Sequence, residues 1–252
     1  MADIKAVVFD FIGTLTSVKN YSLEASTLNL YKAIIEAGFS VDQEDFLSAY
    51  SRAHEKYRLI RYEELVEVTN GVWISDALNS LGFKTSPEDA RVKTAVNVFF
   101  EDYLTSLELN PCAERMLVRL SKRYKLGLIS NFTYAPVIYA ALRRLGVNRF
   151  FSAVLVSEDV GWRKPNRKIF QEALRRLGVK AEETVYVGDS PVEDIEGGAA
   201  AGMRTIFVPS QFYTLENLHE SRMKPDLIVK DICELFKVFH AREFTGEIRP
   251  KK

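Results

Sequence analysis

The chain has 252 residues, 47% hydrophobic and 27% charged, a composition typical of a globular protein with a full hydrophobic core. Its 34 Lys and Arg residues balance its 34 Asp and Glu residues, so no net charge favours nucleic acid or a membrane surface as a partner. No apolar run reaches the roughly 18 residues of a membrane span, and no basic-then-apolar signal pattern opens the sequence, which favours a cytoplasmic location. A small anionic molecule remains the expected partner, because a local cluster of cations suffices to bind one. Nothing in the sequence indicates an oligomeric state.

Six short runs of β-branched and aromatic residues predict six strands. They are IKAVVFDF at 4–11, KLGLISN at 125–131, SAVLVSE at 152–158, TVYVGD at 184–189, RTIFVPS at 204–210 and DLIVKD at 226–231. Most are nearly continuous apolar stretches, as expected for parallel strands covered on both faces. Helical patterns lie between them, such as the one at 166–179, where Gly178 is a typical residue to end a helix. The predicted fold class is therefore α/β, a Rossmann-like parallel sheet with helices on both faces.

Between the first and second of these runs, residues 17–110 contain no convincing strand and have helical periodicity throughout. NLYKAIIEAGF, VDQEDFLSAYSRAHEKY and NGVWISDALNSLGF each place apolar residues three and four apart, and Ser-Pro-Glu at 86–88 predicts a further helix start. A segment of this length is too long for a loop. We therefore expect an all-helical domain at 17–110, inserted into a core of residues 1–16 and 111–240, with a polar tail at 241–252.

Polar residues gather where several of the predicted strands end. They are Asp10, Ser130-Asn131, Ser157-Glu158 and Gly188-Asp189. In open parallel sheets, ligands bind outside the carboxyl ends of the strands. The sequence therefore predicts a site at that edge of the sheet.

The cysteines and histidines show no metal-ligand spacing. Cys112 and Cys233 are far apart in the sequence, and we interpret both as reduced packing residues rather than as a disulfide or metal site. His54, His219 and His240 lie on polar, helix-like segments and are expected at the surface, although His54 would line a pocket if its helix faced one.

Four stretches, taken together, resemble the motifs of the haloacid dehalogenase (HAD) superfamily. They are D-F-I-G-T at 10–14, S-N at 130–131, K-P at 164–165 and G-D-S-P-V-E-D at 188–194. They occur in the family's order and on the expected elements, and the helical insertion resembles that family's helical cap. The resemblance implies a hydrolase that works through a covalent aspartyl intermediate.

The resemblance assigns Asp10 as the nucleophile, a role that suits a carboxylate at a strand end beside a glycine that lets the substrate approach closely. Ser130 would orient a phosphoryl or carboxylate oxygen through its hydroxyl, and Asn131 could add a donor. Gly13 and Thr14 of the first motif complete the implied phosphate site. Lys164 would be the cation that pairs with the nucleophile and the substrate charge, while Arg163 and Arg167 beside it are expected to face solvent.

A magnesium site is also implied by the resemblance, because Mg²⁺ prefers oxygen ligands. Asp10, the backbone carbonyl of Ile12 and Asp189 would hold the metal. Asp194 would support that shell or Lys164, whereas Glu193 is expected on the solvated face.

Ile12 is a departure from the family's phosphatases, which generally have a second aspartate at this position. That aspartate protonates the leaving oxygen and then activates water, and such help contributes about 10²–10⁴-fold. Three hypotheses follow: a Mg²⁺-dependent phosphatase of small phosphorylated molecules with an atypical protonation step, a 2-haloacid dehalogenase, and a non-catalytic anion-binding module.

The first hypothesis fits most of the residues. Dehalogenases of the family also lack the second aspartate, but residues 17–51 contain no arginine in the place of their halide-binding arginine, and the metal-type motif at 188–194 is intact. A nucleophile such as Asp10 would be superfluous in a module that only binds anions. A phosphatase, with its proton supplied elsewhere or not needed, is therefore the main expectation.

Substrate selection is expected to come from side chains of the helical insertion. The stretch from residue 58 to residue 73 offers Arg58, Arg61, Tyr62 and Trp73 as candidates. For any one of them, a helix-surface charge or a core aromatic is the more usual explanation. We also expect the cap to open and close, through segments near 16–20 and 106–111.

Overall fold

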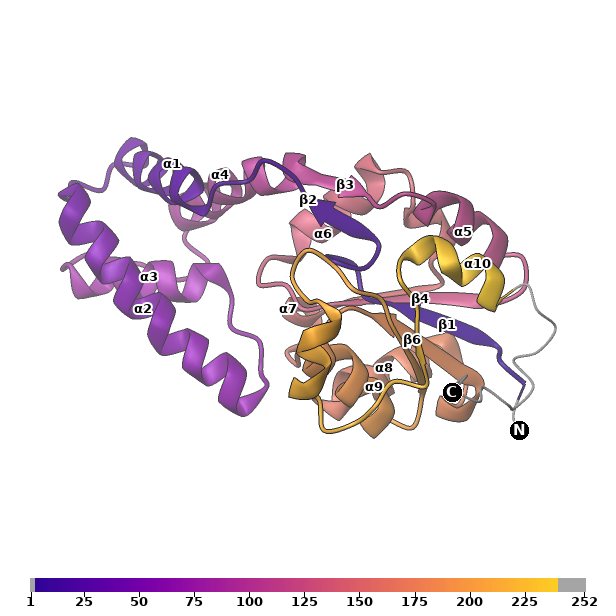
Figure 1. Cartoon of the computed structure of the whole chain (residues 1–252). Coiled ribbons are helices and arrows are strands. Elements are labelled where there is room, and N and C mark those ends of the chain that lie inside the picture. Colours follow the sequence, from indigo (N-terminus) through magenta and orange to yellow (C-terminus); the bar gives the residue numbers. More distant parts are fainter. Residues whose placement is uncertain (1–2, 240–252) are drawn as a thin grey trace.

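A six-stranded parallel sheet forms the centre of the computed structural model, which describes residues 3–239 (Figure 1). The strand order is β5-β4-β1-β6-β7-β8, and every neighbouring pair is parallel. The strands are β1 (Ala6–Phe9), β4 (Lys125–Ser130), β5 (Ala153–Val156), β6 (Thr184–Gly188), β7 (Arg204–Phe207) and β8 (Leu227–Ile228). Each of the six predicted runs contains one of them, which confirms the predicted α/β class.

Helices cover both faces of this sheet, and the alternation along β1 shows why its residues are all apolar. Val7 and Phe9 pack on one side, with α5, α6 and α10, whereas Ala6 and Val8 pack on the other, with α8. A fully buried strand needs apolar residues at every position. The helices of the core are α5 (Ala113–Leu120), α6 (Ala135–Arg144), α7 (Ser157–Val160), α8 (Arg167–Leu177), α9 (Gly197–Ala200) and α10 (Leu235–Val238), with a π-helical turn η3 (Pro191–Glu196) before α9.

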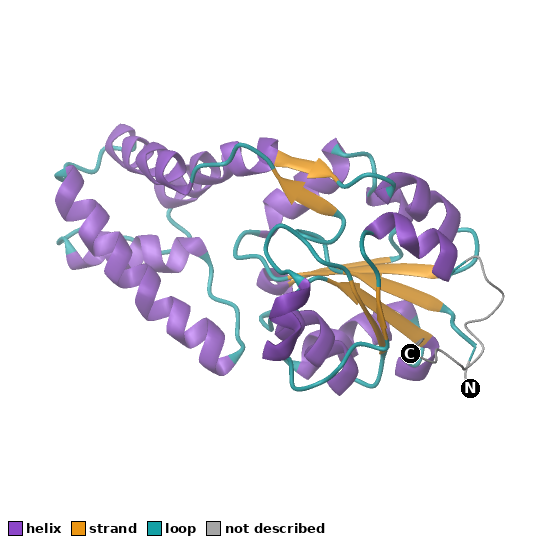
Figure 2. Cartoon of the chain, viewed as in Figure 1, coloured by secondary structure: helices purple, strands orange, loops and turns teal. Residues whose placement is uncertain are grey.

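The remaining long helices lie together beyond one end of the sheet (Figure 2). They are α1 (Leu23–Glu36), α2 (Gln43–Glu64), α3 (Asn70–Ser80) and α4 (Ala90–Ser106). Their apolar faces form a hydrophobic cluster of their own, which includes Phe46, Trp73 and Phe100. α4 begins after Asp89, whose carboxylate accepts a hydrogen bond from the backbone of Arg91, so the helix start predicted at 86–88 was a few residues too early.

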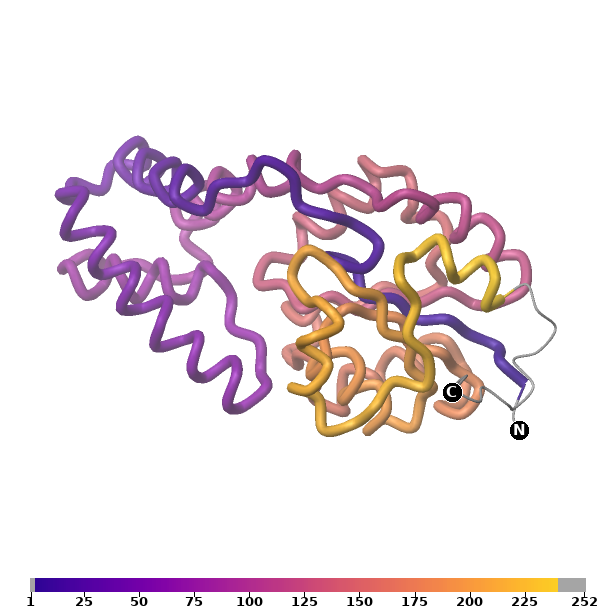
Figure 3. The backbone as a smooth tube through the Cα atoms, in the orientation of Figure 1, coloured from indigo at the N-terminus to yellow at the C-terminus, as the bar shows by residue number. Residues whose placement is uncertain are grey.

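Two chain passages join the helices to the sheet, and they run side by side (Figure 3). β2 (Thr16–Val18) and β3 (Leu107–Leu109) pair there as a small antiparallel ribbon. The expectation of no strand within 17–110 was therefore wrong at its two ends, because strands of three residues are too short to show a periodic pattern. We keep the division into a core of 1–16 and 111–240 and a cap of 17–110 as a proposal.

Cys112 and Cys233 form a disulfide, so the interpretation of both as reduced packing residues was wrong. Their Cα atoms lie 5.3 Å apart although 121 residues separate them in sequence. Cys112 precedes α5, and Cys233 lies in the short helical turn Ile232–Glu234 before α10. The packing of these two elements on the same face of the sheet brings the cysteines together, which no spacing pattern in the sequence can indicate.

Within residues 3–239, no helix is both long and apolar enough to span a membrane. His219 is exposed, as predicted. The predicted polar tail at 241–252 and His240 lie outside the described residues.

Candidate active site

The first strand delivers Asp10 to the carboxyl edge of the sheet, between β4 and β6. The backbone N–H of Asp10 still donates to Val187 O at 2.9 Å, so its position is fixed by the sheet. The chain then turns at Gly13, whose φ of +103° favours glycine. A Cβ atom at Gly13 would lie 2.2 Å from the carboxylate of Asp189, so the glycine also makes room for that acid.

Lys164 lies beside Asp10, fully buried. Its Nζ contacts Asp10 Oδ1 at 2.7 Å and Asp194 Oδ1 at 2.6 Å. It also donates to the hydroxyl of Tyr186 and to the carbonyl of Ile129. Burial by itself would lower the pKa of Lys164, but the charges of Asp10 and Asp194 outweigh it and raise that pKa well above its ordinary value. The ammonium is therefore a permanent cation that links two carboxylates.

Asp194 comes from the π-helical turn η3 and is held on all sides. Its Oδ2 accepts hydrogen bonds from the backbone N–H groups of Asp189 and Ser190, at 3.1 and 2.9 Å. Its Oδ1 accepts from Lys164 and Tyr186. Since both oxygens are engaged by the protein, Asp194 acts as a support for Lys164 and for the turn that carries Asp189.

Asp189 ends the sequence TVYVGD and lies next to Asp10 and Asp194, with carboxylate oxygens within 4.8 Å of one another. Ser210 donates to Asp189 Oδ2 at 2.5 Å, and Thr14 donates weakly to Oδ1 at 3.5 Å. Burial, followed by the charges of Asp10 and Asp194, raises the pKa of Asp189 to about 8. The site therefore contains more buried acid than its one lysine balances.

The donor set fits a divalent cation such as Mg²⁺. Asp10 Oδ2 is buried and has no hydrogen-bond partner among the residues that the structure describes. Burial raises the pKa of Asp10 to about 7, although Lys164 opposes this effect. A cation between Asp10 and Asp189 would satisfy the unpartnered oxygen and offset the excess negative charge.

Ser130 is the last residue of β4, and Asn131 follows it. Ser130 is buried at the end of the strand. Asn131 donates through Nδ2 to the carbonyl of Lys164 at 2.9 Å and accepts from the backbone N–H of Lys164 at 2.7 Å. The amide of Asn131 therefore fixes the backbone of the loop that carries Lys164, which we call the lysine loop. Its predicted contact with substrate stays a prediction.

Arg163 was expected to face solvent, and that expectation was wrong: the residue is 3% exposed. Its guanidinium pairs with Glu193 at 3.2 Å and lies 3.7 Å from Glu67, which belongs to the segment between α2 and α3. Backbone hydrogen bonds from Arg163 to Leu65 and from Glu67 to Gly161 join the two segments. Arg163 therefore anchors the cap segment to the lysine loop, and Glu193 is half-buried as its partner rather than fully solvated. Arg167 is exposed, as predicted.

A cavity of about 290 Å³ lies between cap and core. His54, Arg61 and Trp73 of the cap line it, whereas Arg58 is exposed and pairs with Glu55. Asn131 and the two residues after it line the same cavity from the core, which places it next to the strand end that carries Ser130. Tyr62 is not among the lining residues; its ring lies 4.4 Å from the guanidinium of Arg163.

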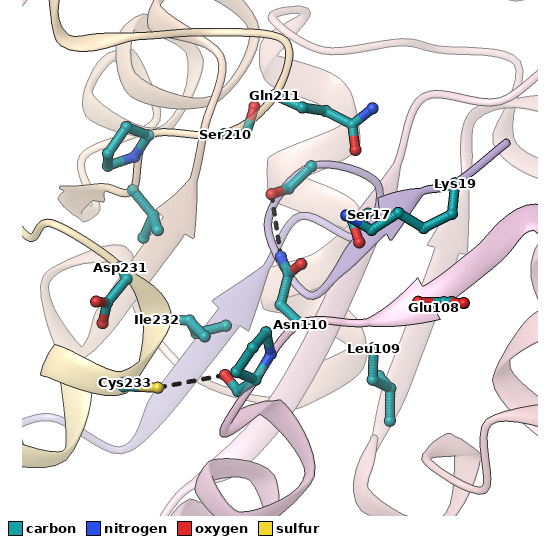
Figure 4. A pocket seen from close by; sticks show the side chains of 14 residues that line it. Ser17, Lys19, Glu108, Leu109, Asn110, Ser210, Gln211, Asp231, Ile232 and Cys233 are labelled. Carbon is teal, nitrogen blue, oxygen red and sulfur yellow. Dashed lines mark hydrogen bonds between the residues drawn. The ribbon is translucent and has the colours of Figure 1, made fainter.

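A second, larger hollow of about 560 Å³ lies at the ribbon β2–β3, on the side of the disulfide (Figure 4). Asn110 there donates to the carbonyl of Thr14 at 2.8 Å, and Ser210 in its wall is the residue that contacts Asp189. Residues of this wall therefore contact both the loop after β1 and Asp189.

Two functional residues were missed from sequence. Tyr186 lies between two valines in a strand that is buried throughout, and its hydroxyl contacts Lys164 and Asp194. A polar atom in a buried strand must find a partner, and that signal could have identified it. Ser210 follows β7 at the same sheet edge as the other site residues, so its place after the strand RTIFVPS was the available signal.

Comparison with known proteins agrees with this geometry. A family model described as haloacid dehalogenase-like hydrolase matches residues 4–202. The chain belongs to this family. It is 37% identical over 210 residues to a glyceraldehyde 3-phosphate phosphatase of Methanopyrus kandleri, covering 81% of this chain and 83% of that one. It is 32% identical to a protein of the same name from Methanothermobacter thermautotrophicus, covering 93% and 99%.

Solved structures also resemble this one. A 2-haloacid dehalogenase from Pseudomonas syringae superposes with a TM-score of 0.68 at 27% identity, covering 94% of this chain and 98% of that chain. The relatives with the higher identities are phosphatases, and the chain is accordingly a HAD-like hydrolase of the phosphatase type.

Proposed function

We propose that the protein is a Mg²⁺-dependent phosphatase of a small phosphorylated metabolite, and that it works through an aspartyl-phosphate at Asp10. The observation that carries this proposal is the set of groups around Asp10: Lys164 holds one carboxylate oxygen, and the other is buried beside Asp189 with no partner among residues 3–239. An oxygen that the protein does not bind is available for attack or for a metal.

In the first step, a carboxylate oxygen of Asp10 attacks phosphorus, the bond from phosphorus to the ester oxygen breaks, and the departing oxygen takes up a proton. In the second, water attacks the phosphorus of the aspartyl-phosphate, and the bond to Asp10 breaks to release inorganic phosphate. Lys164 keeps Asp10 oriented and supplies positive charge, while Ser130, with Gly13 and Thr14, would hold the phosphoryl oxygens. Bound Mg²⁺, held by Asp10, Asp189 and the backbone carbonyl of Ile12, would supply further positive charge at those oxygens.

Because Ile12 occupies the position of the family's usual second aspartate, another group must donate the proton to the departing oxygen. Tyr103 of α4 is our candidate for a hydrogen-bond donor, since it lines the cavity between cap and core and packs against Phe132, with ring centroids 5.4 Å apart. Burial, with the charges of Tyr21 and Asp10, raises the pKa of Tyr103 well above its ordinary value, so its hydroxyl keeps its proton. Replacement by phenylalanine would remove the donor and preserve the ring.

We propose a phosphorylated compound of about triose size as substrate, since relatives covering most of the chain are named for glyceraldehyde 3-phosphate. The cytoplasmic location stays a prediction from the sequence. Release of phosphate from glyceraldehyde 3-phosphate, stopped by a chelator and restored by Mg²⁺, tests the proposal. No phosphate release from any monoester in Mg²⁺ would overturn it.

A 2-haloacid dehalogenase is the second candidate, favoured by Ile12 and by the resemblance to the Pseudomonas syringae structure. Halide leaves without a proton, so this reaction does not need the missing aspartate. Chloride release from a 2-chloro acid, unaffected by a chelator, would establish it. The same panel of substrates, run with Mg²⁺ and with chelator, therefore separates the two activities.

A further inference from the structure

The cavity between cap and core has apolar walls and a few polar groups. Aromatic rings form much of its lining, including Trp73, Phe100 and Phe132. Its volume of about 290 Å³ is at the small end for ligand sites, which typically have about 300–1,000 Å³. The space suits a short carbon chain, and a nucleotide would not fit.

Arg61 brings a cation to this cavity from the last turn of α2. Its side chain is 11% exposed, and its Nε donates to Glu67 at 2.7 Å. This bond orients the guanidinium, which carries further N–H groups on its two Nη atoms. The guanidinium carbon lies 5.6 Å from the ring centroid of Trp73. A guanidinium fixed at its Nε end is well suited to bind a carbonyl or carboxylate oxygen with its other end.

Asn70 brings an unsatisfied acceptor to the same cavity. The residue is 3% exposed, and its Oδ1 has no hydrogen-bond partner within the described part of the chain. Leaving a buried polar group unpaired costs free energy, which a hydrogen bond from a bound hydroxyl group would recover. His54, in the same lining, has its pKa lowered by burial and by the charge of Arg61, so its ring is neutral at neutral pH.

We propose that this cavity binds the end of the substrate remote from phosphorus and selects compact hydroxycarbonyl or hydroxycarboxylate phosphates. Arg61 donates to the carbonyl or carboxylate oxygen, and Asn70 Oδ1 accepts from the hydroxyl group. Asn131, which lines the cavity and holds the Lys164 loop, connects this end of the site to the nucleophile. The inference rests on the proposed function, because it names the substrate class of that same site.

Binding to the Asp10→Asn protein tests the proposal without requiring turnover. Glyceraldehyde 3-phosphate and propyl phosphate have the same carbon chain, and only the first has the hydroxyl and carbonyl groups. With Mg²⁺ present, calorimetry on this full-length variant should give a dissociation constant about 100-fold lower for glyceraldehyde 3-phosphate, since sites that pair with substrate polar groups reject analogues that lack them. Arg61→Gln and Asn70→Leu, each added to Asp10→Asn, should each reduce that preference at least about 10-fold.

Arg58→Gln is the matched control, because Arg58 is on the same helix, exposed and paired with Glu55. It should keep the full preference. Equal affinity for the two phosphates, or equal losses from Arg58→Gln and Arg61→Gln, would overturn the assignment. Unfolding curves of each variant exclude misfolding as the cause, and Asn70→Leu adds a second, uncharged test if Arg61→Gln is unstable.

Phosphate release by the unmodified protein is measured separately with both compounds. Turnover of both without discrimination would contradict the cavity's role and leave the phosphatase assignment standing. Selective binding without any turnover would support the cavity's role and contradict the phosphatase assignment.

Discussion

The sheet edge that carries Asp10 and the cavity between cap and core each pair a cation with a carboxylate, but the edge is built from charged groups and the cavity mainly from aromatic ones. At the edge, the protein binds Lys164 and both oxygens of Asp194, and Asp10 Oδ2 has no partner in the described part of the chain. In the cavity, aromatic walls surround Arg61 and Asn70, and the acceptor of Asn70 is left unpaired among the described residues. This difference fits our proposals that the core carries out the reaction and that the cap selects the substrate.

Loss of the nucleophile should give the largest effect. Asp10→Asn should lower kcat at least about 10³-fold, because no aspartyl-phosphate can form. Phosphate release in excess Mg²⁺ is the measurement, with Asp45→Asn on the exposed surface of α2 as the control that keeps full activity. Activity retained by Asp10→Asn, with deamidation excluded by mass, would remove Asp10 from the chemistry.

Loss of the disulfide should affect the core without changing the substrate preference of the cap. Cys112→Ser combined with Cys233→Ser opens a covalent loop of 121 residues, which should lower the free energy of unfolding by about 4 kcal/mol. Urea unfolding measures this loss. The ratio of activities on glyceraldehyde 3-phosphate and propyl phosphate should stay the same. An unchanged unfolding midpoint would mean that the disulfide does not constrain the unfolded chain. A changed ratio of activities would mean that the disulfide in the core affects substrate selection by the cap.

Removal of the metal should lower activity through the site around Asp10 and should not change the cavity between cap and core. A chelator should lower turnover about 100-fold or more, because the excess of buried carboxylates would repel the phosphate. Added Mg²⁺ should restore it, which phosphate release measures. Metal-independent hydrolysis would show that Lys164 alone offsets the charge of Asp10 and Asp189.

A carboxylate at position 12 should have the smallest effect, and it should be a gain. Ile12→Asp should raise kcat for alkyl phosphates about 10-fold, a part of the 10²–10⁴-fold that general acid–base help contributes. Aryl phosphates have a better leaving group and should gain less. If Ile12→Asp changes nothing and Tyr103→Phe lowers kcat, the cap already supplies the proton.

The sequence predicted the catalytic edge better than the cap. Asp10 and Asp189 end predicted parallel strands, so they were expected at one edge of the sheet, whereas Lys164 was placed beside Asp10 only by the resemblance of its motif to the family. Arg163 was misplaced because its burial depends on Glu67, which lies almost a hundred residues earlier and reaches it only when cap and core meet. The prediction that Cys112 and Cys233 are reduced was wrong for a similar reason, because helix packing rather than sequence spacing brings them together.

Trapping the covalent intermediate tests the role of Asp10 most directly. Acid quenching during turnover of glyceraldehyde 3-phosphate, followed by mass spectrometry of peptides, should find the peptide with Asp10 heavier by one phosphoryl group. The adduct should be lost when hydroxylamine cleaves the acyl phosphate, and it should be missing from Asp10→Asn. Sustained phosphate release with no phosphorylated Asp10 at any quench time, or with the phosphoryl group on another residue, would contradict the account.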